Sequence, residues 1–419
     1  MRVLIVGSGG REHAIAWKLR QSPKLTELYC APGNAGIRSL AACLPIEAED
    51  IYGITDFAKT QGIDLVAVGP EVPLAMGLVD LLIEHGVKAF GPNKKCAQLE
   101  ASKAFAKSFM ERHNIPTARY KEFYNHDELM EHVGQFGFPM VLKADGLAAG
   151  KGVIIAETAS AAREAIDDMM LRRIFGSAAD TVVVEEFLTG VEASMLCFVD
   201  GSTIVPMEPA QDYKRVFDRD RGPNTGGMGA YSPSLVFNDA LEDQIREQIL
   251  APIHEGFKMD GLDYRGVLYI GLMITEEGPK VIEFNTRFGD PETQVILPRM
   301  ESDLLRIMQA VTNDRLSGQE ISWNKAKAVC VVLASGGYPG IYEKGELITG
   351  LDQIEESTLV FHAGTQFING QVVTSGGRVL GVTALGASHD EARENAYRNA
   401  ERINFKGMHY RKDIGLLNI

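Results

Sequence analysis

Short apolar runs alternate with segments of helical periodicity through the first ninety residues of the chain. These patterns predict strands over residues 2–6, 25–30, 64–70 and 88–92, with helices over 11–21 and 73–85. Such alternation is typical of a parallel α/β sheet. Because ligands bind beyond the carboxyl ends of the strands in such sheets, the loops Pro32–Asn34 and Gly69–Leu74 are candidate binding loops.

The pattern changes after residue 92. A long helix is predicted from an Asn93 cap to just before Pro116. Residues 120–188 then predict a small α+β module of strand, helix, strand, glycine-rich turn, strand, helix and strand. The remaining chain predicts strands from 191, a polar glycine-rich loop to 230, a helix over 239–258, two strands over 266–275 and 278–286, and a small mostly-β domain from 326.

Composition narrows the possible classes of protein. A length of 419 residues suggests about three domains, and a formal net charge of −14 argues against a nucleic-acid partner held through its phosphates. The five cysteines include no CxxC pair, so we expect reduced thiols rather than a disulfide framework or a zinc site. The first apolar run is too short for a signal peptide, and no stretch reaches the length of a membrane span. A cytoplasmic protein is therefore predicted, with no membrane partner.

The first glycine-rich stretch, VGSGGREH, follows the first predicted strand. A dinucleotide-binding turn has the pattern GxGxxG and an acidic residue about 20 residues later. Here Glu12 occupies the third glycine position, and no acid follows the second strand at Cys30. Two interpretations remain for Gly9 and Gly10: a turn that binds an anion at a helix start, or glycines that only allow close packing.

The second glycine-rich stretch, KADGLAAGKGV over residues 143–153, is not a P-loop, because that motif would need glycine at Asp145 and a hydroxyl at Gly152. A hairpin between two strands could instead close over phosphates, with Lys143 and Lys151 supplying positive charge. An ordinary solvated hairpin is the alternative.

Two strand ends carry polar side chains. The run VVVEEFLTGVEAS brings Glu185, Glu186 and Glu192 to the end of an apolar strand, where carboxylates could accept hydrogen bonds from a ribose or could simply be solvated. In KVIEFNTR, residues two apart share one face of a strand, so Glu283, Asn285 and Arg287 should point the same way. Carboxylate and amide oxygens suit Mg²⁺, and an arginine can hold an anion. The helical period places Lys103 away from the apolar side of its helix, in solvent.

The order of these pieces resembles the ATP-grasp superfamily. Within it, the motifs GSGGREHA, GPEVPL, KADGLAAGKGV, QDYKR, GPNTGGMGAYSP and EFNTRFGDPETQ are similar to those of the phosphoribosylamine-glycine ligases of purine biosynthesis. The likeness extends to GGYPG and GGRVLGVTALG near the end of the chain. It implies an α/β and α+β multidomain protein, divided into an amino-terminal parallel α/β domain (1–100), a linker that begins the ATP-grasp domain (101–120), a lid module (121–189), a central ATP-grasp domain (190–325) and a mostly-β domain (326–419).

The resemblance also implies roles for individual residues. ATP would be bound by Lys103, Lys143, Gly146, Gly150, Lys151, Gly152, Glu185, Glu186, Leu188 and Glu192. Glu283 and Asn285 would hold Mg²⁺ or Mn²⁺. Arg287 would grip an anionic group of the substrate, with Asp212 and Lys214 near the acceptor. The loops of Gly9, Gly10 and Glu71 would hold phosphoribosylamine.

The implied reaction joins glycine to 5-phosphoribosylamine at the expense of ATP, through glycyl phosphate. Two alternatives stay open: another ATP-grasp ligase or carboxylase with a different substrate, and an NAD-binding or non-catalytic protein. The expected partners are small molecules only. A monomer is expected, with a dimer as the alternative.

Overall fold

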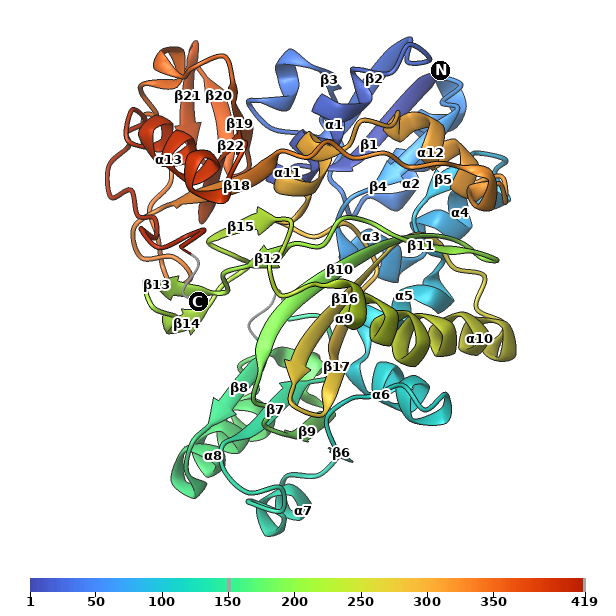
Figure 1. Cartoon of the computed structure of the whole chain (residues 1–419), viewed down its shortest axis with the longest axis vertical. Coiled ribbons are helices and arrows are strands. Elements are labelled where there is room, and N and C mark those ends of the chain that lie inside the picture. The colour runs from blue at the N-terminus through green and yellow to red at the C-terminus, as the bar shows by residue number, and fades with distance from the viewer. Residues whose placement is uncertain (149–151, 417–419) are drawn as a thin grey trace.

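The computed structural model describes residues 1–148 and 152–416 (Figure 1). Five parallel strands form an amino-terminal sheet in the order β3-β2-β1-β4-β5, which confirms the predicted α/β fold of this region. Its elements are β1 (Arg2–Gly7), α1 (Gly10–Leu19), β2 (Glu27–Pro32), β3 (Ala42–Cys43), α2 (Ile51–Thr60), β4 (Leu65–Val68), α3 (Glu71–Met76), α4 (Leu78–Glu84) and β5 (Ala89–Phe90). Because β1 lies at the centre of the sheet, the loops after β1 and β4 leave the same edge side by side.

Two predicted helices are each broken in two. The helix predicted over 73–85 is interrupted at Gly77, whose φ of +96° is left-handed, between α3 and α4. The helix predicted after Asn93 is divided at Ser102 into α5 (Lys94–Ala101) and α6 (Lys103–Arg112). Ser102 has extended backbone angles, and its hydroxyl accepts a hydrogen bond from Phe105 N at 3.0 Å. This serine therefore caps a second helix with a new direction.

Residues 120–148 and 152–186 form the small α+β module that the sequence predicts, and we call it the lid. Its antiparallel sheet has the order β6-β9-β7-β8, and helices cover one face. The lid buries its own apolar cluster, which includes Phe123, Leu142 and Val184, and it lies at the lower end of the molecule in Figure 1. Its elements are β6 (Tyr120–Phe123), α7 (His126–Glu131), β7 (Met140–Ala144), β8 (Val153–Ala156), α8 (Ala159–Ile166) and β9 (Val182–Glu186).

The central antiparallel sheet, β11-β10-β16-β17, lies between the lid and the amino-terminal domain (Figure 1). The helix predicted over 239–258 is present as α9 and α10, joined by one π-helical turn. The elements of this region are β10 (Val191–Asp200), β11 (Ile204–Pro206), α9 (Asp239–Ile245), α10 (Ala251–Asp260), β16 (Arg265–Thr275), β17 (Gly278–Asn285), α11 (Thr293–Ile296) and α12 (Leu304–Val311).

A β-bulge in β17 determines which side chains reach the site. Gly271 pairs with Glu283 but Leu272 pairs with Val281, so Ile282 is one residue extra. Val281 is therefore buried before the bulge and Phe284 after it. Without the extra residue, Glu283 would share the face of Val281 and point into the core.

The carboxyl-terminal region is mostly β, as predicted, but its sheet recruits strands from residues 211–232. This stretch was expected to be a loop; it forms β12 and β15, which extend the sheet β12-β15-β18-β22-β19, and a β13-β14 hairpin. The strands are β12 (Gln211–Asp212), β13 (Arg215–Phe217), β14 (Arg221–Asn224), β15 (Gly229–Ser232), β18 (Lys327–Ala334), β19 (Thr358–His362), β20 (Thr365–Ile368), β21 (Gln371–Thr374) and β22 (Arg378–Gly386), followed by α13 (His389–Ala400). Asp212 is thus anchored to the carboxyl-terminal sheet. The domain boundaries themselves stay predictions.

The buried His13 and the partly buried His362 join the amino-terminal and carboxyl-terminal domains. His362 N donates a hydrogen bond to His13 Nδ1 at 2.7 Å, and the two rings lie 5.6 Å apart. Burial lowers the pKa of His13 to about 3, with a further contribution from His362, and lowers the pKa of His362 to about 4. Both rings are therefore neutral in the folded protein at pH values where they are charged in the unfolded chain.

We expect acidification to weaken this contact. As the pH falls below about 6.5, each of the two histidines binds a proton in the unfolded chain but stays neutral in the folded protein. Each histidine therefore lowers the free energy of unfolding by about 1.4 kcal/mol per pH unit, until the pH reaches its pKa in the folded protein. The His13→Asn variant lacks one of these histidines, so below about pH 6.5 its free energy of unfolding, measured by urea denaturation, should decrease by about 1.4 kcal/mol less per unit of falling pH than that of the unmodified protein. Equal pH slopes for both proteins would contradict the assignment.

Candidate active site

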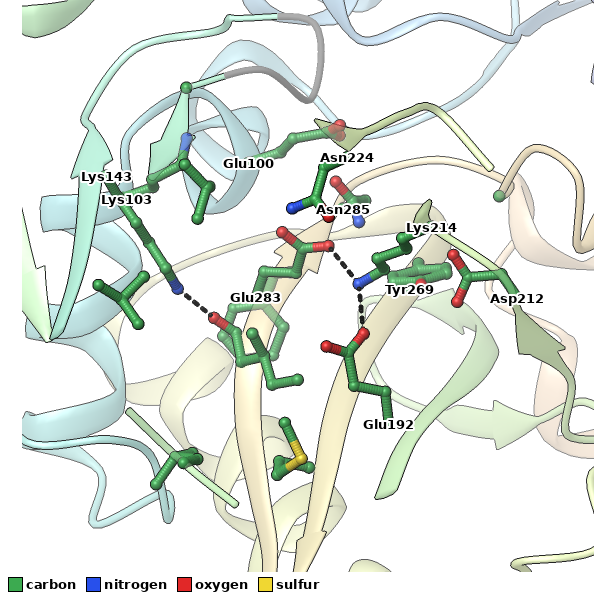
Figure 2. A pocket seen from close by; sticks show the side chains of 18 of the residues that line it. Glu100, Lys103, Lys143, Glu192, Asp212, Lys214, Asn224, Tyr269, Glu283 and Asn285 are labelled. Atoms are coloured by element: carbon green, nitrogen blue, oxygen red, sulfur yellow. Dashed lines mark hydrogen bonds and ion pairs between the residues drawn. The ribbon is translucent and has the colours of Figure 1, made fainter. Parts of the chain in front are cut away.

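A cavity of about 660 Å³ lies between the lid, the central sheet and the strands that follow residue 210. Figure 2 shows Lys103 and Lys143 on one side of it, Lys214 and Asp212 on the other, and Glu283 between them. We call the first group, Lys103, Lys107, Lys143 and Glu185, the lysine-rich side. The second group, Glu192, Asp212, Lys214 and Glu292, is the acidic side.

Lys103 is the first residue of α6, because Ser102 ends the preceding helix. Its side chain lines the cavity, its Nζ donates to Gly146 O at 3.5 Å, and burial lowers the pKa of its ammonium group. The predicted solvent exposure of Lys103 is wrong, since it assumed one continuous helix. Contact with ATP phosphates stays a prediction.

Lys143 and Glu185 form an ion pair between neighbouring lid strands, with 2.9 Å between Lys143 Nζ and Glu185 Oε1. Lys143 Nζ also donates to the carbonyl of Ile282, the bulge residue of β17, at 3.1 Å. The second oxygen of Glu185 lies 3.1 Å from Nζ of Lys107. Each of the three charged side chains is at least 94% buried.

Residues 186–192 line the cavity at its lid end. Leu188 contributes an apolar wall, and Glu186 is turned toward Arg119, whose Nε lies 2.6 Å from Glu186 Oε2. Burial opposes ionisation of Glu186, but hydrogen bonds from Arg119 outweigh it and lower the pKa. Glu192 pairs with Lys214 at 3.1 Å. These placements leave the predicted nucleotide contacts of the segment as predictions.

The glycine-rich stretch of the lid is described only in part. Gly150 and Lys151 lie outside the described residues. Gly152 lines the cavity, and its carbonyl accepts a hydrogen bond from Ala144 N at 2.8 Å. A Cβ atom at Gly146 would lie 2.9 Å from the backbone of Ala178, so this glycine is required for close packing.

Glu283 and Asn285 both line the cavity, on the face that the bulge of β17 turns away from the core. Burial alone would raise the pKa of Glu283, but Lys214, Lys143 and Lys103 outweigh it and hold the carboxyl ionised. An ionised carboxylate beside an amide oxygen fits a hard divalent cation. Within residues 1–148 and 152–416, no group of three or more His, Cys, Asp or Glu side chains is arranged to hold a metal ion. Further ligands would have to come from bound phosphates or water.

On the acidic side, carboxylates surround the ammonium group of Lys214. Lys214 Nζ lies 3.1 Å from Glu192 and 3.7 Å from Glu283, and these carboxylates raise its pKa although burial opposes this (Figure 2). Burial raises the pKa of Asp212 to about 8; Lys214 opposes this shift, and the nearby carboxylates add to it. Burial also raises the pKa of Glu292. The Asp212 carboxyl on this side of the cavity therefore gains and loses its proton near pH 8.

Arg287 follows the end of β17 and lines the cavity, but its guanidinium already holds two carboxylates. Nε lies 2.9 Å from Glu71 and Nη2 lies 2.9 Å from Glu100. Burial opposes ionisation of both acids; Arg287 overcomes it at Glu71, where it lowers the pKa to about 2, whereas the pKa of Glu100 is raised. Arg287 and Glu71, which are both predicted to contact substrate, thus belong to one cluster of ion pairs.

The turn at Gly9 and Gly10 does not line the cavity. Gly9 N donates to Glu12 Oε2 at 2.5 Å, and Arg11 N donates to Asp290 Oδ2 at 3.4 Å. Gly10 packs against Gln294, which a Cβ atom would approach to 2.6 Å. Two of the amide groups that could bind an anion therefore face carboxylates of the chain itself, and the assignment of phosphoribosylamine to this turn stays a prediction.

Several cavity residues were not predicted: Glu100, Lys107, Asn224, Tyr269 and Glu292. Lys107 carried a usable signal, since it lies four residues after Lys103 and shares its helix face. Tyr269, whose hydroxyl lies 2.8 Å from Ser194 Oγ, sits in an apolar strand pattern with no such signal.

Comparison with known proteins assigns the whole chain. Three domains of the phosphoribosylglycinamide synthetase family match it: the N domain at residues 1–100, the ATP-grasp (A) domain at 101–293 and the C domain at 328–417. A protein of Caldanaerobacter subterraneus named phosphoribosylamine-glycine ligase is 51% identical over 414 residues, covering 99% of both chains. A chicken protein named trifunctional purine biosynthetic protein adenosine-3 is 53% identical, and the match spans 42% of its length.

The fold agrees with this assignment. A crystal structure of phosphoribosylamine-glycine ligase from Thermotoga maritima matches with a TM-score of 0.84 and 36% identity, covering 99% of this chain and all of the other. The chain belongs to the phosphoribosylglycinamide synthetase family.

Proposed function

We propose that the protein ligates glycine to 5-phosphoribosylamine and releases glycinamide ribonucleotide, ADP and phosphate, as a step of purine synthesis. The observation that carries this proposal is the cavity itself, in which two lysines and the Glu283-Asn285 pair lie opposite an acidic side that can accept a proton. The match of all three domains to the family supports it.

Making an amide in water requires an activated carboxylate. In the proposed reaction, a carboxylate oxygen of glycine attacks the γ-phosphorus of ATP and forms glycyl phosphate and ADP. The amine of phosphoribosylamine then attacks the acyl carbon, phosphate leaves and the nitrogen loses a proton. Phosphoryl transfer depends on positioning and charge neutralisation, which lysines and a cation provide without a protein nucleophile.

We assign the nucleotide to the lysine-rich side, with Lys103 and Lys143 toward the phosphates and Gly146 and Gly152 beside them. Glu185, Glu186 and Leu188 would lie along the adenine, and Glu192 would reach the ribose from the acidic side. Glu283 and Asn285 would hold Mg²⁺ or Mn²⁺, which neutralises phosphate charge when bound. Because acyl phosphates hydrolyse readily, the lid has a second task, the exclusion of water.

We assign the acceptor to the other side. Asp212 and Lys214 would lie beside the reacting amine, and Arg287 beside the carboxylate or acyl phosphate of glycine. Glu71, Gly9 and Gly10 would lie toward the ribose phosphate. Asp212 is the proposed acceptor for the proton that the amine loses.

The role of Asp212 predicts a pH profile. Below about pH 8 its carboxyl group is protonated and accepts no proton, so kcat should rise up to tenfold per pH unit toward pH 8 when amide formation limits the rate. The Asp212→Asn variant should be slower at pH 8 and should lack this rise. A variant with the same slope as the unmodified protein would remove Asp212 from this role.

The overall proposal is tested by ADP release from the purified protein. Release should require both glycine and phosphoribosylamine. Release that continues without glycine, or with bicarbonate in its place, would favour another ATP-grasp ligase or carboxylase. Binding of NAD(H) with no ADP formed from the complete mixture would contradict any ligase.

We also propose that the protein acts in the cytoplasm as a monomer on small molecules, without a nucleic-acid or membrane partner. The net charge of −14 supports the absence of a nucleic-acid partner. Within the described residues, every helix is too short or too polar to cross a membrane. Sedimentation equilibrium distinguishes the monomer from a dimer.

A further inference from the structure

Lys107 is the most deeply buried lysine on the lysine-rich side of the cavity. Its side chain is only 2% exposed, one helical turn after Lys103 on α6. Besides its ion pair with Glu185, its Nζ donates to Thr117 Oγ1 at 2.8 Å and to Ala118 O at 3.2 Å. Taking an ammonium group out of water is unfavourable, so a buried lysine with three polar partners indicates a specific task.

The charge balance of the three buried groups suggests that task. Glu185 offers Oε1 to Lys143 at 2.9 Å and Oε2 to Lys107 at 3.1 Å. Two lysines thus share one carboxylate, and a positive charge is left over. Without Lys107, the carboxylate of Glu185 and the ammonium of Lys143 would cancel each other, and attraction of an anion into the cavity would fall.

The position of each group decides which lysine meets a ligand. Lys107 is held from behind by the chain at Thr117 and Ala118, between α6 and the first lid strand. Lys143 reaches from the lid to the bulge carbonyl of Ile282, the residue before Glu283, and its charge acts on the Glu283 carboxylate. Phosphates near Glu283 would therefore meet Lys143.

We propose that Lys107 is a positioning residue for nucleotide binding: it neutralises Glu185 from behind, so that Lys143 keeps its charge for the phosphates of ATP. The inference rests on the proposed function only in taking ATP as a substrate. The inference gives Glu185 a second role, because this carboxylate would cancel the charge of Lys143 if Lys107 did not neutralise it. Lys103 and Lys107 of α6 then both serve the binding of the nucleotide.

The test compares binding of ATP and of adenosine by calorimetry, in the absence of glycine and phosphoribosylamine. In Lys107→Met, the dissociation constant for ATP should rise at least tenfold, which corresponds to about 1.4 kcal/mol, while that for adenosine should change less than twofold. Lys107→Arg, which keeps the charge, should bind ATP within about threefold of the unmodified protein. Lys121→Met removes an exposed lysine from the same module and should leave both constants unchanged.

A second substitution isolates the charge argument. The double variant Lys107→Met/Glu185→Gln lacks the carboxylate that would cancel Lys143 and keeps the net charge of the unmodified cluster, so its ATP affinity should return to within about threefold of that of the unmodified protein. This comparison stays informative if the single Lys107→Met variant does not fold. A tenfold loss of ATP affinity that persists in the double variant, or an equal loss of ATP and adenosine binding in the single variant, would show a structural role and overturn the inference. An unmodified protein that binds neither compound would overturn the proposed function instead.

Discussion

Replacing Glu283 with alanine should lower the rate of ADP release at least about a thousandfold, a loss of about 4 kcal/mol of transition-state stabilisation. Of the two predicted metal ligands, Glu283 supplies a carboxylate and Asn285 an amide oxygen, and the lysines around Glu283 keep it ionised. Removing it leaves the amide of Asn285 as the one remaining predicted ligand of the cation. Initial rates at saturating ATP, glycine and phosphoribosylamine give the measurement.

Folding should survive this change. The Glu283 side chain is 35% exposed toward the cavity, and Lys214 keeps its pair with Glu192 at 3.1 Å. Glu277→Ala is the matched control, because it removes a 75% exposed carboxylate from the turn before the same strand and should leave the rate unchanged. Near-normal turnover of Glu283→Ala, with an unchanged circular dichroism spectrum, would refute the metal assignment.

Replacing Arg287 with methionine should lower the stability of the protein by about 3–5 kcal/mol and also abolish activity. Glu71 and Glu100 come from α3 and α5, and Arg287 is the cation that neutralises both. Its loss leaves two largely buried carboxylates facing each other, which disfavours the folded state. Urea denaturation followed by fluorescence measures the loss.

The same cluster offers a rescue. Glu71→Gln and Glu100→Gln, added to Arg287→Met, remove the uncompensated charges and should restore more than half of the lost stability while activity stays low. Arg112→Met is the control for an exposed pair, since Arg112 meets Asp260 at 2.6 Å with 46% of its side chain exposed, and it should cost less than about 1 kcal/mol. A small loss of stability in Arg287→Met would show that water already screens the cluster.

The local pattern of apolar and polar residues was sufficient to predict the general architecture. The alternation of apolar strands and helices predicted the parallel amino-terminal sheet, and the lid follows the predicted order of elements. It failed at Ser102, because a serine is tolerated inside a helix and also caps one; only packing decides between the two. It failed again over residues 211–232, where β12 pairs with β15 and β15 joins the sheet by pairing with β18, about a hundred residues later.

Within the site, sequence order identified the charged residues but not their partners. Arg287 lies 216 residues from Glu71, and no local pattern connects them. Lys107 differs from these, because its spacing from Lys103 already placed both lysines on one helix face. The spacing did not predict that Lys107 is buried, and its burial makes this lysine part of a charge network.

The bulge at Ile282 makes β17 a strand with two phases. Upstream of it the odd-numbered residue Val281 fills the core, whereas downstream the even-numbered Phe284 does, and Glu283 and Asn285 are thereby free to face the cavity. In a strand with uninterrupted alternation, Val281 and Phe284 would point to opposite faces of the sheet, because they are three residues apart. Only one of them could then be buried in the core. The extra residue thus lets one short segment satisfy two incompatible demands, a continuous apolar interior and a polar wall, and its own carbonyl becomes the acceptor that draws Lys143 across from the lid.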